Sequence, residues 1–228
     1  MTPAPADMTE ILLIRHGQPR PGYVDPPLSP VGRHQSERLG RWLAGERVDA
    51  VVASPMARAL ETAEVAAHEM ALAVAGTLED LREWDRDHRS DGTYVAIEDL
   101  GDDNPRSHAL RTGRYEYFVP DIDRTGFLSR ARRVVDELSD RWPGRRVAAF
   151  SHGGLINAAL STVLGLEEQL FFFLPDYTSV STVRVMPGGR RVVHALNNTS
   201  HLVGQRVPEP DSMLARRPGA DRPIIRTQ

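Results

Sequence analysis

Hydrophobic and polar positions follow one another along this chain in blocks that are typical of buried strands and amphipathic helices. Three short, continuous apolar runs predict strands that are buried on both faces, as in a parallel sheet, at residues 11–14, 48–53 and 146–150. Apolar residues at three- and four-residue spacing predict four helices, over residues 31–46, 57–70, 126–142 and from 153 to near 165. The turn residues Pro187-Gly188-Gly189 separate two further strand-like segments and predict a late hairpin over 179–186 and 191–196.

This alternation of strands and helices predicts an α/β fold with a mostly parallel central sheet and a late antiparallel hairpin. We expect one main domain over residues 8–203, since 228 residues suit a single sizeable core. Residues 86–124 are rich in Asp, Arg and Tyr and lack clear periodicity, which predicts an insertion or lid. The stretch 204–228 is rich in Pro and Arg and poor in apolar residues, which predicts a flexible tail.

The composition narrows the classes of partner and of chemistry. The formal net charge of -3 and the 26% of charged residues are typical of globular proteins, and they disfavour a nucleic-acid partner. All 28 Lys and Arg positions are Arg, so a permanent cation in any site must be a guanidinium. The absence of Cys excludes disulfides and thiolate catalysis. The chain shows neither a signal peptide nor an apolar run of membrane-spanning length, so we expect a cytoplasmic protein with no membrane partner.

Charged residues and glycines follow each of the three predicted buried strands. The first strand is followed by Arg15-His16-Gly17, the second by Ser54-Pro55 with Arg58 soon after, and the third by Ser151-His152-Gly153-Gly154. Ligands of open α/β sheets bind beyond the carboxyl ends of the strands, so these residues are the first candidates for a site. A cation in the first turn of a helix, as expected for Arg58, is unfavourable unless an anion binds nearby. Gly153 begins the next helix, where free backbone amides can bind an anion.

Two histidines, two arginines and a helix N-terminus together favour phosphate chemistry. Arg15 and Arg58 can each bind phosphate oxygens and stabilise the charge of a transferring phosphoryl group. One imidazole, when unprotonated, can attack phosphorus and form a phosphohistidine that water later cleaves. The other can stay protonated beside the dianion, because a neighbouring negative charge raises its pKa. The strand ends carry no carboxylate cluster, so we expect neither a metal nor a cofactor.

In these motifs the sequence resembles the histidine phosphatase superfamily, also called the phosphoglycerate-mutase-like family. Four pieces occur in order, namely Arg15-His16-Gly17 after a strand, Leu28-Ser29-Pro30-Val31-Gly32 before a helix, Ser54-Pro55 with Arg58 and Glu61-Thr62-Ala63, and Ser151-His152-Gly153-Gly154. Together they span roughly residues 10–165. The resemblance implies a three-layer α/β/α fold, and the late hairpin is compatible with the family's sheet.

The resemblance also implies a role for each candidate residue. His16 is the phosphorylated nucleophile, and Arg15, Arg58 and His152 complete the phosphate pocket. Many family members carry Leu-Arg-Glu where this chain has Leu81-Arg82-Glu83, which makes Glu83 the expected proton donor to the leaving group.

The residues after Glu83 depart from the family's usual pattern. The glycine-rich continuation is replaced by Asp85-Arg86-Asp87-His88-Arg89, which leaves Asp85 open as an alternative proton donor. The same departure leaves open a non-catalytic module that binds a phosphate ligand without a working acid.

A second departure concerns the residues that follow Arg15-His16-Gly17. Cofactor-dependent phosphoglycerate mutases usually continue with Glu-Ser, whereas this chain has Gln18-Pro19. The preferred hypothesis is therefore a metal-independent phosphomonoesterase acting on a small soluble phosphate ester, with a phosphomutase as the alternative. The sequence leaves open both the identity of the ester and whether the protein forms a homo-oligomer.

Overall fold

The computed structural model describes residues 8–84, 94–96, 100–101, 103–114, 123–167 and 170–204. Its strands are β1 (Thr9–Arg15), β2 (Ala50–Ala53), β3 (Val74–Thr77), β4 (Arg146–Ser151), β5 (Val180–Val185) and β6 (Arg191–Asn198). Its α-helices are α1 (Pro30–Ala44), α2 (Ala57–Glu69), α3 (Pro105–Arg111), α4 (Arg124–Arg141) and α5 (Gly153–Leu164). Two short 3-10 helices complete the described elements, η1 (Glu79–Leu81) and η4 (Ser200–Leu202).

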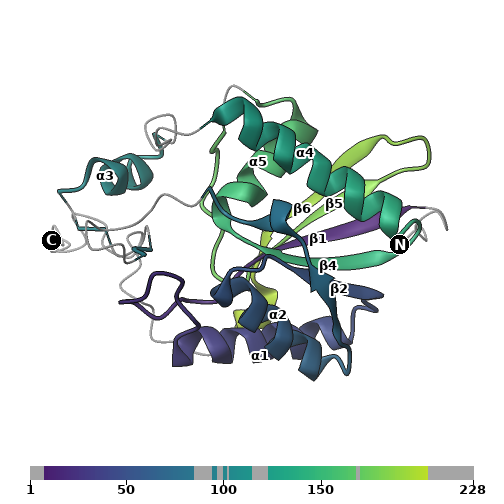
Figure 1. Ribbon diagram of the computed structural model, residues 1–228, viewed down its shortest axis with the longest axis horizontal. Coiled ribbons are helices and arrows are strands. Elements are labelled where there is room, and N and C mark those ends of the chain that lie inside the picture. The colour runs from purple at the N-terminus through teal and green to yellow at the C-terminus, as the bar shows by residue number, and fades with distance from the viewer. Residues whose placement is uncertain are drawn as a thin grey trace, which may run out of the picture.

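The six strands form one sheet in the order β3-β2-β4-β1-β5-β6 (Figure 1). Strands β3, β2, β4 and β1 are parallel to one another. Strand β5 pairs with β1 in the antiparallel direction, and β6 pairs with β5 in the same way. The predicted α/β fold with a mostly parallel sheet and a late antiparallel hairpin is therefore confirmed.

Helices cover both faces of the sheet, because successive residues of the buried strands face opposite sides. On β1, Ile11 and Leu13 pack in the cluster formed with α4 and α5, whereas Leu12 and Ile14 pack in the cluster formed with α1 and α2. All four side chains are at most 1% exposed. Figure 1 shows the resulting three layers, with α4 and α5 on one side of the sheet and α1 and α2 on the other.

The strands β1 and β4 lie next to each other at the point where the chain changes direction across the sheet. The helix that follows β1 is α1, and the helix that follows β4 is α5 on the opposite face. Such a switch point leaves a crevice beyond the carboxyl ends of the two strands, where ligands of open α/β sheets bind. We therefore expect the candidate site at the residues immediately after β1 and β4.

Several elements differ from the sequence-based expectations. The edge strand β3 was not predicted, because its four residues Val-Ala-Gly-Thr are half-buried or exposed and include a glycine. The helix α4 begins at Arg124, two residues earlier than predicted, where the Asp123 side chain accepts a hydrogen bond from the Gly126 backbone amide.

The predicted insertion at 86–124 contains the unpredicted helix α3, and its other parts lie largely outside the described residues. The role of this insertion as a lid stays a prediction, as does the domain boundary at 203. The expected tail lies outside the described residues beyond 204. No helix within the described ranges is both long and apolar enough to cross a membrane.

Close backbone packing joins the end of β1 to the first turn of α1. A Cβ atom on Gly32 would lie 2.1 Å from the carbonyl oxygen of Gln18, and one on Gly17 would lie 2.6 Å from the carbonyl oxygen of Gly32. At the other end of α1, a Cβ atom on Gly45 would meet no atom closer than 3.6 Å.

We expect Gly32→Ala to lower the free energy of unfolding by about 1–3 kcal/mol, because the added methyl group must push two backbone segments apart. Gly45→Ala, on the same helix, should be neutral or stabilising by about 0.5 kcal/mol. Chemical denaturation of the two variants and the wild type measures both changes. Equal stability of Gly32→Ala and the wild type would contradict this packing.

Candidate active site

The register of the parallel strands brings three chain segments together at one edge of the sheet. Arg15 pairs with Ser151 across β1 and β4, and Ala53 pairs with Phe150 across β2 and β4. The residues that follow these strands are therefore neighbours in space. The predicted candidates His16 and His152 come together in this way, with their ring centroids 5.1 Å apart.

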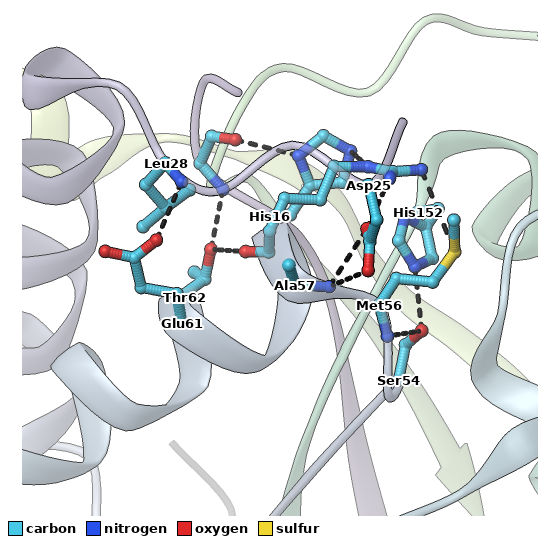
Figure 2. A network of polar contacts seen from close by, with 11 residues as sticks. His16, Asp25, Leu28, Ser54, Met56, Ala57, Glu61, Thr62 and His152 are labelled. Carbon is cyan, nitrogen blue, oxygen red and sulfur yellow. Dashed lines mark hydrogen bonds and ion pairs between the residues drawn. The ribbon is translucent and has the colours of Figure 1, made fainter. Parts of the chain in front are cut away.

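The His16 ring is held by a contact at each of its nitrogen atoms (Figure 2). Its Nδ1 lies 2.8 Å from the carbonyl oxygen of Gly17, and its Nε2 lies 3.2 Å from Nε of Arg58. A carbonyl only accepts and a guanidinium only donates, so the proton of the neutral ring is on Nδ1 and the lone pair is on Nε2. The Nε2 atom therefore has the electron pair that a nucleophile needs.

The backbone beside His16 is fixed by Thr62 of α2. The Gly17 amide donates to Oγ1 of Thr62 at 2.9 Å, and the same hydroxyl donates to the carbonyl oxygen of Arg58 at 2.6 Å. Thr62 is fully buried. One hydroxyl thus links the turn that carries His16 to the helix that carries Arg58 (Figure 2).

His152 is fully buried next to the end of β2. Its Nε2 lies 2.9 Å from Oγ of Ser54, and the same oxygen accepts a weaker hydrogen bond from the Met56 amide at 3.3 Å. Its Nδ1 is buried and has no hydrogen-bond partner among the described residues. A buried polar atom of this kind is suited to contact a ligand, because leaving it unpaired costs free energy.

The two candidate arginines are both buried, with Arg15 4% and Arg58 1% exposed. The Arg15 guanidinium donates to the carbonyl oxygen of Pro175 at 2.6 Å and stacks on the Tyr177 ring at 4.2 Å. The Arg58 guanidinium stacks on the Tyr94 ring at 4.3 Å. Aromatic faces attract cations without neutralising them, so both charges remain to act on the pocket.

The electrostatics of the pocket favour neutral histidines. Burial, followed by the charges of Arg58 and Arg15, lowers the pKa of His16 well below 6.5. Burial, followed by the charge of Arg58, likewise lowers the pKa of His152. The sequence-based expectation of a protonated His152 assumed a phosphate dianion beside it, whereas the protein's own charges favour the neutral ring.

Glu83 lies at the N-terminus of α5, beside His152. Its Oε2 accepts a hydrogen bond from the Gly154 amide at 2.9 Å, and a Cβ atom on Gly154 would lie only 2.3 Å from its Oε1. One of the amides expected to bind an anion is therefore already used by the carboxyl group of Glu83. The neighbouring Gly153 lies close to Arg15, since a Cβ atom there would be 3.7 Å from Nε of Arg15. Asp85, the alternative proton donor, lies outside the described residues.

The segment that carries Glu83 is anchored through its backbone. Ser151 Oγ donates to the carbonyl oxygen of Leu81 at 2.7 Å. The Arg130 guanidinium donates to the carbonyl oxygens of Arg82 and Glu83 at 2.7 and 3.1 Å. The position of Glu83 at this edge is thus set by β4 and α4. Within the described ranges, no group of three or more His, Asp or Glu residues is placed to hold a metal ion.

Tyr177 is a residue of the site that the sequence analysis did not select. Its ring lies 5.8 Å from the His16 ring, in addition to its contact with Arg15. The chain around it is fixed by Asn157 of α5, whose side chain bonds the backbone of Phe172 and Phe173. Only the order Pro175-Asp176 before a strand could have indicated a turn there, and nothing in that pattern indicates a contact with His16.

Comparisons with known proteins agree on one family. The family model described as the histidine phosphatase superfamily (branch 1) matches residues 11–199. Phosphoglycerate mutase-like protein 4 of Arabidopsis thaliana is 25% identical over 209 residues, which cover 86% of this chain and 88% of the relative.

Two further comparisons include a mutase and a phosphatase. A 2,3-bisphosphoglycerate-dependent phosphoglycerate mutase of Methylorubrum extorquens is 26% identical over 191 residues, covering 76% of this chain and 87% of the relative. A phosphoserine phosphatase of Entamoeba histolytica, solved with phosphoserine, aligns with a TM-score of 0.64 at 20% identity, covering 86% of this chain and all of the other.

The protonation of the two histidines can be measured by nitrogen-detected NMR of histidine side chains. A solvated histidine titrates near pH 6.5, so it is mostly protonated at about pH 5.5. Because the pKa values of His16 and His152 are lowered, we expect both rings to stay neutral on acidification from pH 7 to about 6, with the His16 proton on Nδ1. A His16 ring that titrates at or above pH 6.5, or carries its proton on Nε2, would contradict the geometry.

Proposed function

Because the chain belongs to the histidine phosphatase superfamily, we propose that it is a metal-independent phosphomonoesterase that works through a phosphohistidine on His16. One observation carries the proposal. The Nε2 atom of His16 carries its lone pair in a pocket that two buried guanidiniums make positive, and without a ligand that lone pair accepts a hydrogen bond from Arg58. Such a pocket attracts the dianionic phosphoryl group and keeps the nucleophile unprotonated.

The first step transfers the phosphoryl group from the substrate to the protein. The lone pair of His16 Nε2 forms a bond to phosphorus while the bond from phosphorus to the ester oxygen breaks. Arg15 and Arg58 stabilise the charge on the phosphoryl oxygens, and His152 binds one of them through Nδ1. The leaving oxygen takes a proton from Glu83 and departs as an alcohol.

The second step returns the phosphoryl group to water. Glu83, now a carboxylate, takes a proton from a water molecule as the water oxygen bonds to phosphorus. The bond from phosphorus to Nε2 breaks, inorganic phosphate leaves, and His16 and Glu83 regain their starting states. Glu83 lies at the N-terminus of α5, and Gly154, Arg130 and Ser151 hold Glu83 and the residues before it in place. This position supports Glu83 as the proton carrier. Asp85 remains the alternative for this role.

A hydrolase is preferred to a mutase because of the residues after Gly17. Gln18 replaces the glutamate of the mutases, and its side-chain oxygen accepts a hydrogen bond from the Ser29 hydroxyl at 2.7 Å. The backbone amide of Gln18 donates to Oε1 of Gln35 at 2.9 Å. These contacts bind Gln18 to the start of α1, so its side chain has a structural use there.

We propose a small soluble phosphate ester as the substrate and a cytoplasmic location for the protein.

We expect His16→Ala to lower the turnover of an aryl phosphate by on the order of 10⁴-fold or more, because the nucleophile is lost. His194→Ala is the matched control, since His194 is exposed on the edge strand β6. Release of free phosphate measures the activity of both variants. Near wild-type turnover by His16→Ala would overturn the proposal.

Three measurements test the proposed hydrolase against its alternatives. A phosphomutase converts a phosphorylated acid into its isomer without releasing phosphate, which phosphorus NMR detects. A non-catalytic module binds inorganic phosphate and hydrolyses no member of a panel of phosphometabolites. Rapid-quench mass spectrometry should detect an acid-labile adduct on His16 only if the phosphohistidine forms.

We expect a chelator such as EDTA to change kcat/KM by less than about twofold, because the proposed steps use guanidiniums where other phosphatases use metal ions. Steady-state kinetics with and without EDTA, after dialysis, tests this. A loss of activity that is restored by a divalent cation would show that the pocket works differently.

A further inference from the structure

The loop between β1 and α1 passes over the start of α2. Pro19 and Leu28 form an antiparallel bridge, and the Arg20 amide donates to the carbonyl oxygen of Pro27 at 2.8 Å. Residues between these pairs form the end of the loop and include Asp25. Figure 2 shows the Asp25 carboxylate beside Ala57, in the same network of polar contacts as His16.

The start of α2 has no cap within its own sequence. Its N-cap residue, Met56, makes no side-chain cap hydrogen bond, and the first turn contains no acid. Both carboxylate oxygens of Asp25 lie near the Ala57 amide, at 3.0 and 3.1 Å. Asp25 therefore supplies from the loop the negative group that stabilises the N-terminus of a helix.

The same carboxylate also faces Arg58, which lies in the first turn of α2. Oδ1 of Asp25 lies 3.7 Å from Nη1 of Arg58, the end of the guanidinium opposite to the Nε that faces His16. Asp25 is half-exposed, whereas Arg58 is 1% exposed. The loop thus holds one end of a guanidinium whose other end contacts the proposed nucleophile.

A second contact of the loop reaches the other side of Arg58. The Tyr94 amide donates to the carbonyl oxygen of Tyr23 at 2.8 Å, and the Tyr94 ring stacks on the Arg58 guanidinium. The loop end therefore contacts Arg58 directly through Asp25 and indirectly through Tyr94. Arg58 is confined between an ion pair and an aromatic face.

We propose that Asp25 is a positioning residue for Arg58, holding its guanidinium so that Nε points to the phosphoryl site at His16 Nε2. This inference rests on the proposed function only where catalysis is concerned, because phosphate binding by Arg58 is measurable without turnover. A displacement of catalytic groups by about 1 Å can cost about 100-fold in rate, so a residue of this kind can matter without touching the substrate.

Electrostatic repulsion between Asp25 and phosphate predicts a change in phosphate affinity of the opposite sign. A carboxylate near the pocket repels phosphate, so removing it strengthens anion binding if repulsion dominates. Asp25 is half-exposed and therefore screened by water, whereas the direction of a buried guanidinium affects phosphate at contact distance. Positioning should therefore dominate, and loss of Asp25 should weaken phosphate binding.

The experiment compares Asp25→Asn and Asp25→Ala with the wild type. Asparagine keeps an oxygen for the Ala57 amide but loses the charge that faces Arg58, whereas alanine loses both. We expect Asp25→Ala to weaken inorganic phosphate binding by about 10-fold in calorimetry and to lower kcat/KM by about 10- to 100-fold, with kcat reduced as well as KM raised. Asp25→Asn should be intermediate.

Glu61→Gln provides a matched control, because Glu61 lies in α2 and contacts the same loop. Glu61 accepts a hydrogen bond from the Leu28 amide at 2.7 Å and pairs with Arg33, so it also anchors the loop to α2 but does not contact Arg58. We expect this variant to bind phosphate within about twofold of the wild type. Equal losses in Glu61→Gln and Asp25→Asn would assign the effect to the loop as a whole and overturn the inference.

The titration of His16 gives a readout that a purely structural role would not change. The charged and titratable groups facing its ring are Arg58, Arg15, His152 and Tyr177. If Arg58 moves away in Asp25→Ala, its lowering effect on the His16 pKa weakens, so the NMR titration shifts to higher pH. Unchanged or tighter phosphate binding, with a His16 titration that is unchanged or shifted to lower pH, would refute positioning.

Thermal unfolding separates these effects from misfolding, and Asp25→Asn keeps the test informative if Asp25→Ala is unstable. The two proposals also fail separately. A wild-type protein without phosphatase activity whose phosphate binding still depends on Asp25 refutes only the proposed function. An active wild type matched by a folded, equally active Asp25→Asn with the same phosphate affinity refutes only the role of Asp25.

Discussion

Two guanidiniums buried beside two imidazoles are the interaction on which the chemistry of this site depends. Burial, followed by the charges of Arg58 and Arg15, lowers the pKa of both His16 and His152 and so favours the neutral rings. The same cations make the pocket attractive to a dianion. The surrounding contacts of Arg15 and Arg58, a carbonyl oxygen, a half-exposed carboxylate and two tyrosine faces, stabilise the guanidiniums without removing their positive field. Phosphoryl transfer needs an unprotonated nucleophile beside a bound phosphoryl group. This arrangement meets both requirements.

The part of the fold that could be predicted is the part that depends on local pattern. The buried strands β1, β2 and β4 are apolar on both faces, so their sequences indicate a parallel sheet without any knowledge of the partners. Given parallel strands, the rule that ligands bind at their carboxyl ends is sufficient to bring His16 and His152 together. The prediction of Arg58 in the first turn of a helix also follows from local sequence, since α2 begins at Ala57.

The elements that escaped prediction depend on distant contacts. The strand β3 has too few apolar residues for its sequence to predict a strand. It forms because its backbone pairs with β2. Tyr177 reaches His16 because Asn157, some twenty positions earlier, fixes the preceding loop through three hydrogen bonds to backbone groups of Phe172 and Phe173. Asp25 and Ala57 are separated by 32 positions, and neither carries a pattern that indicates the other. Local sequence rules cannot find contacts of this kind.

The altered residues after Glu83 can be understood from how the preceding segment is anchored. Its hydrogen bonds to Ser151 and Arg130 use the carbonyl oxygens of residues 81–83, which every amino acid provides. The side chain of Trp84 adds packing against Phe127 and Phe171. The position of Glu83 is therefore determined upstream of Asp85 and by partners in β4 and α4. A departure from the family's pattern that begins at Asp85 leaves all of these contacts intact, which is the physical reason to keep Glu83 as the proposed proton donor and to look for substrate selectivity beyond it.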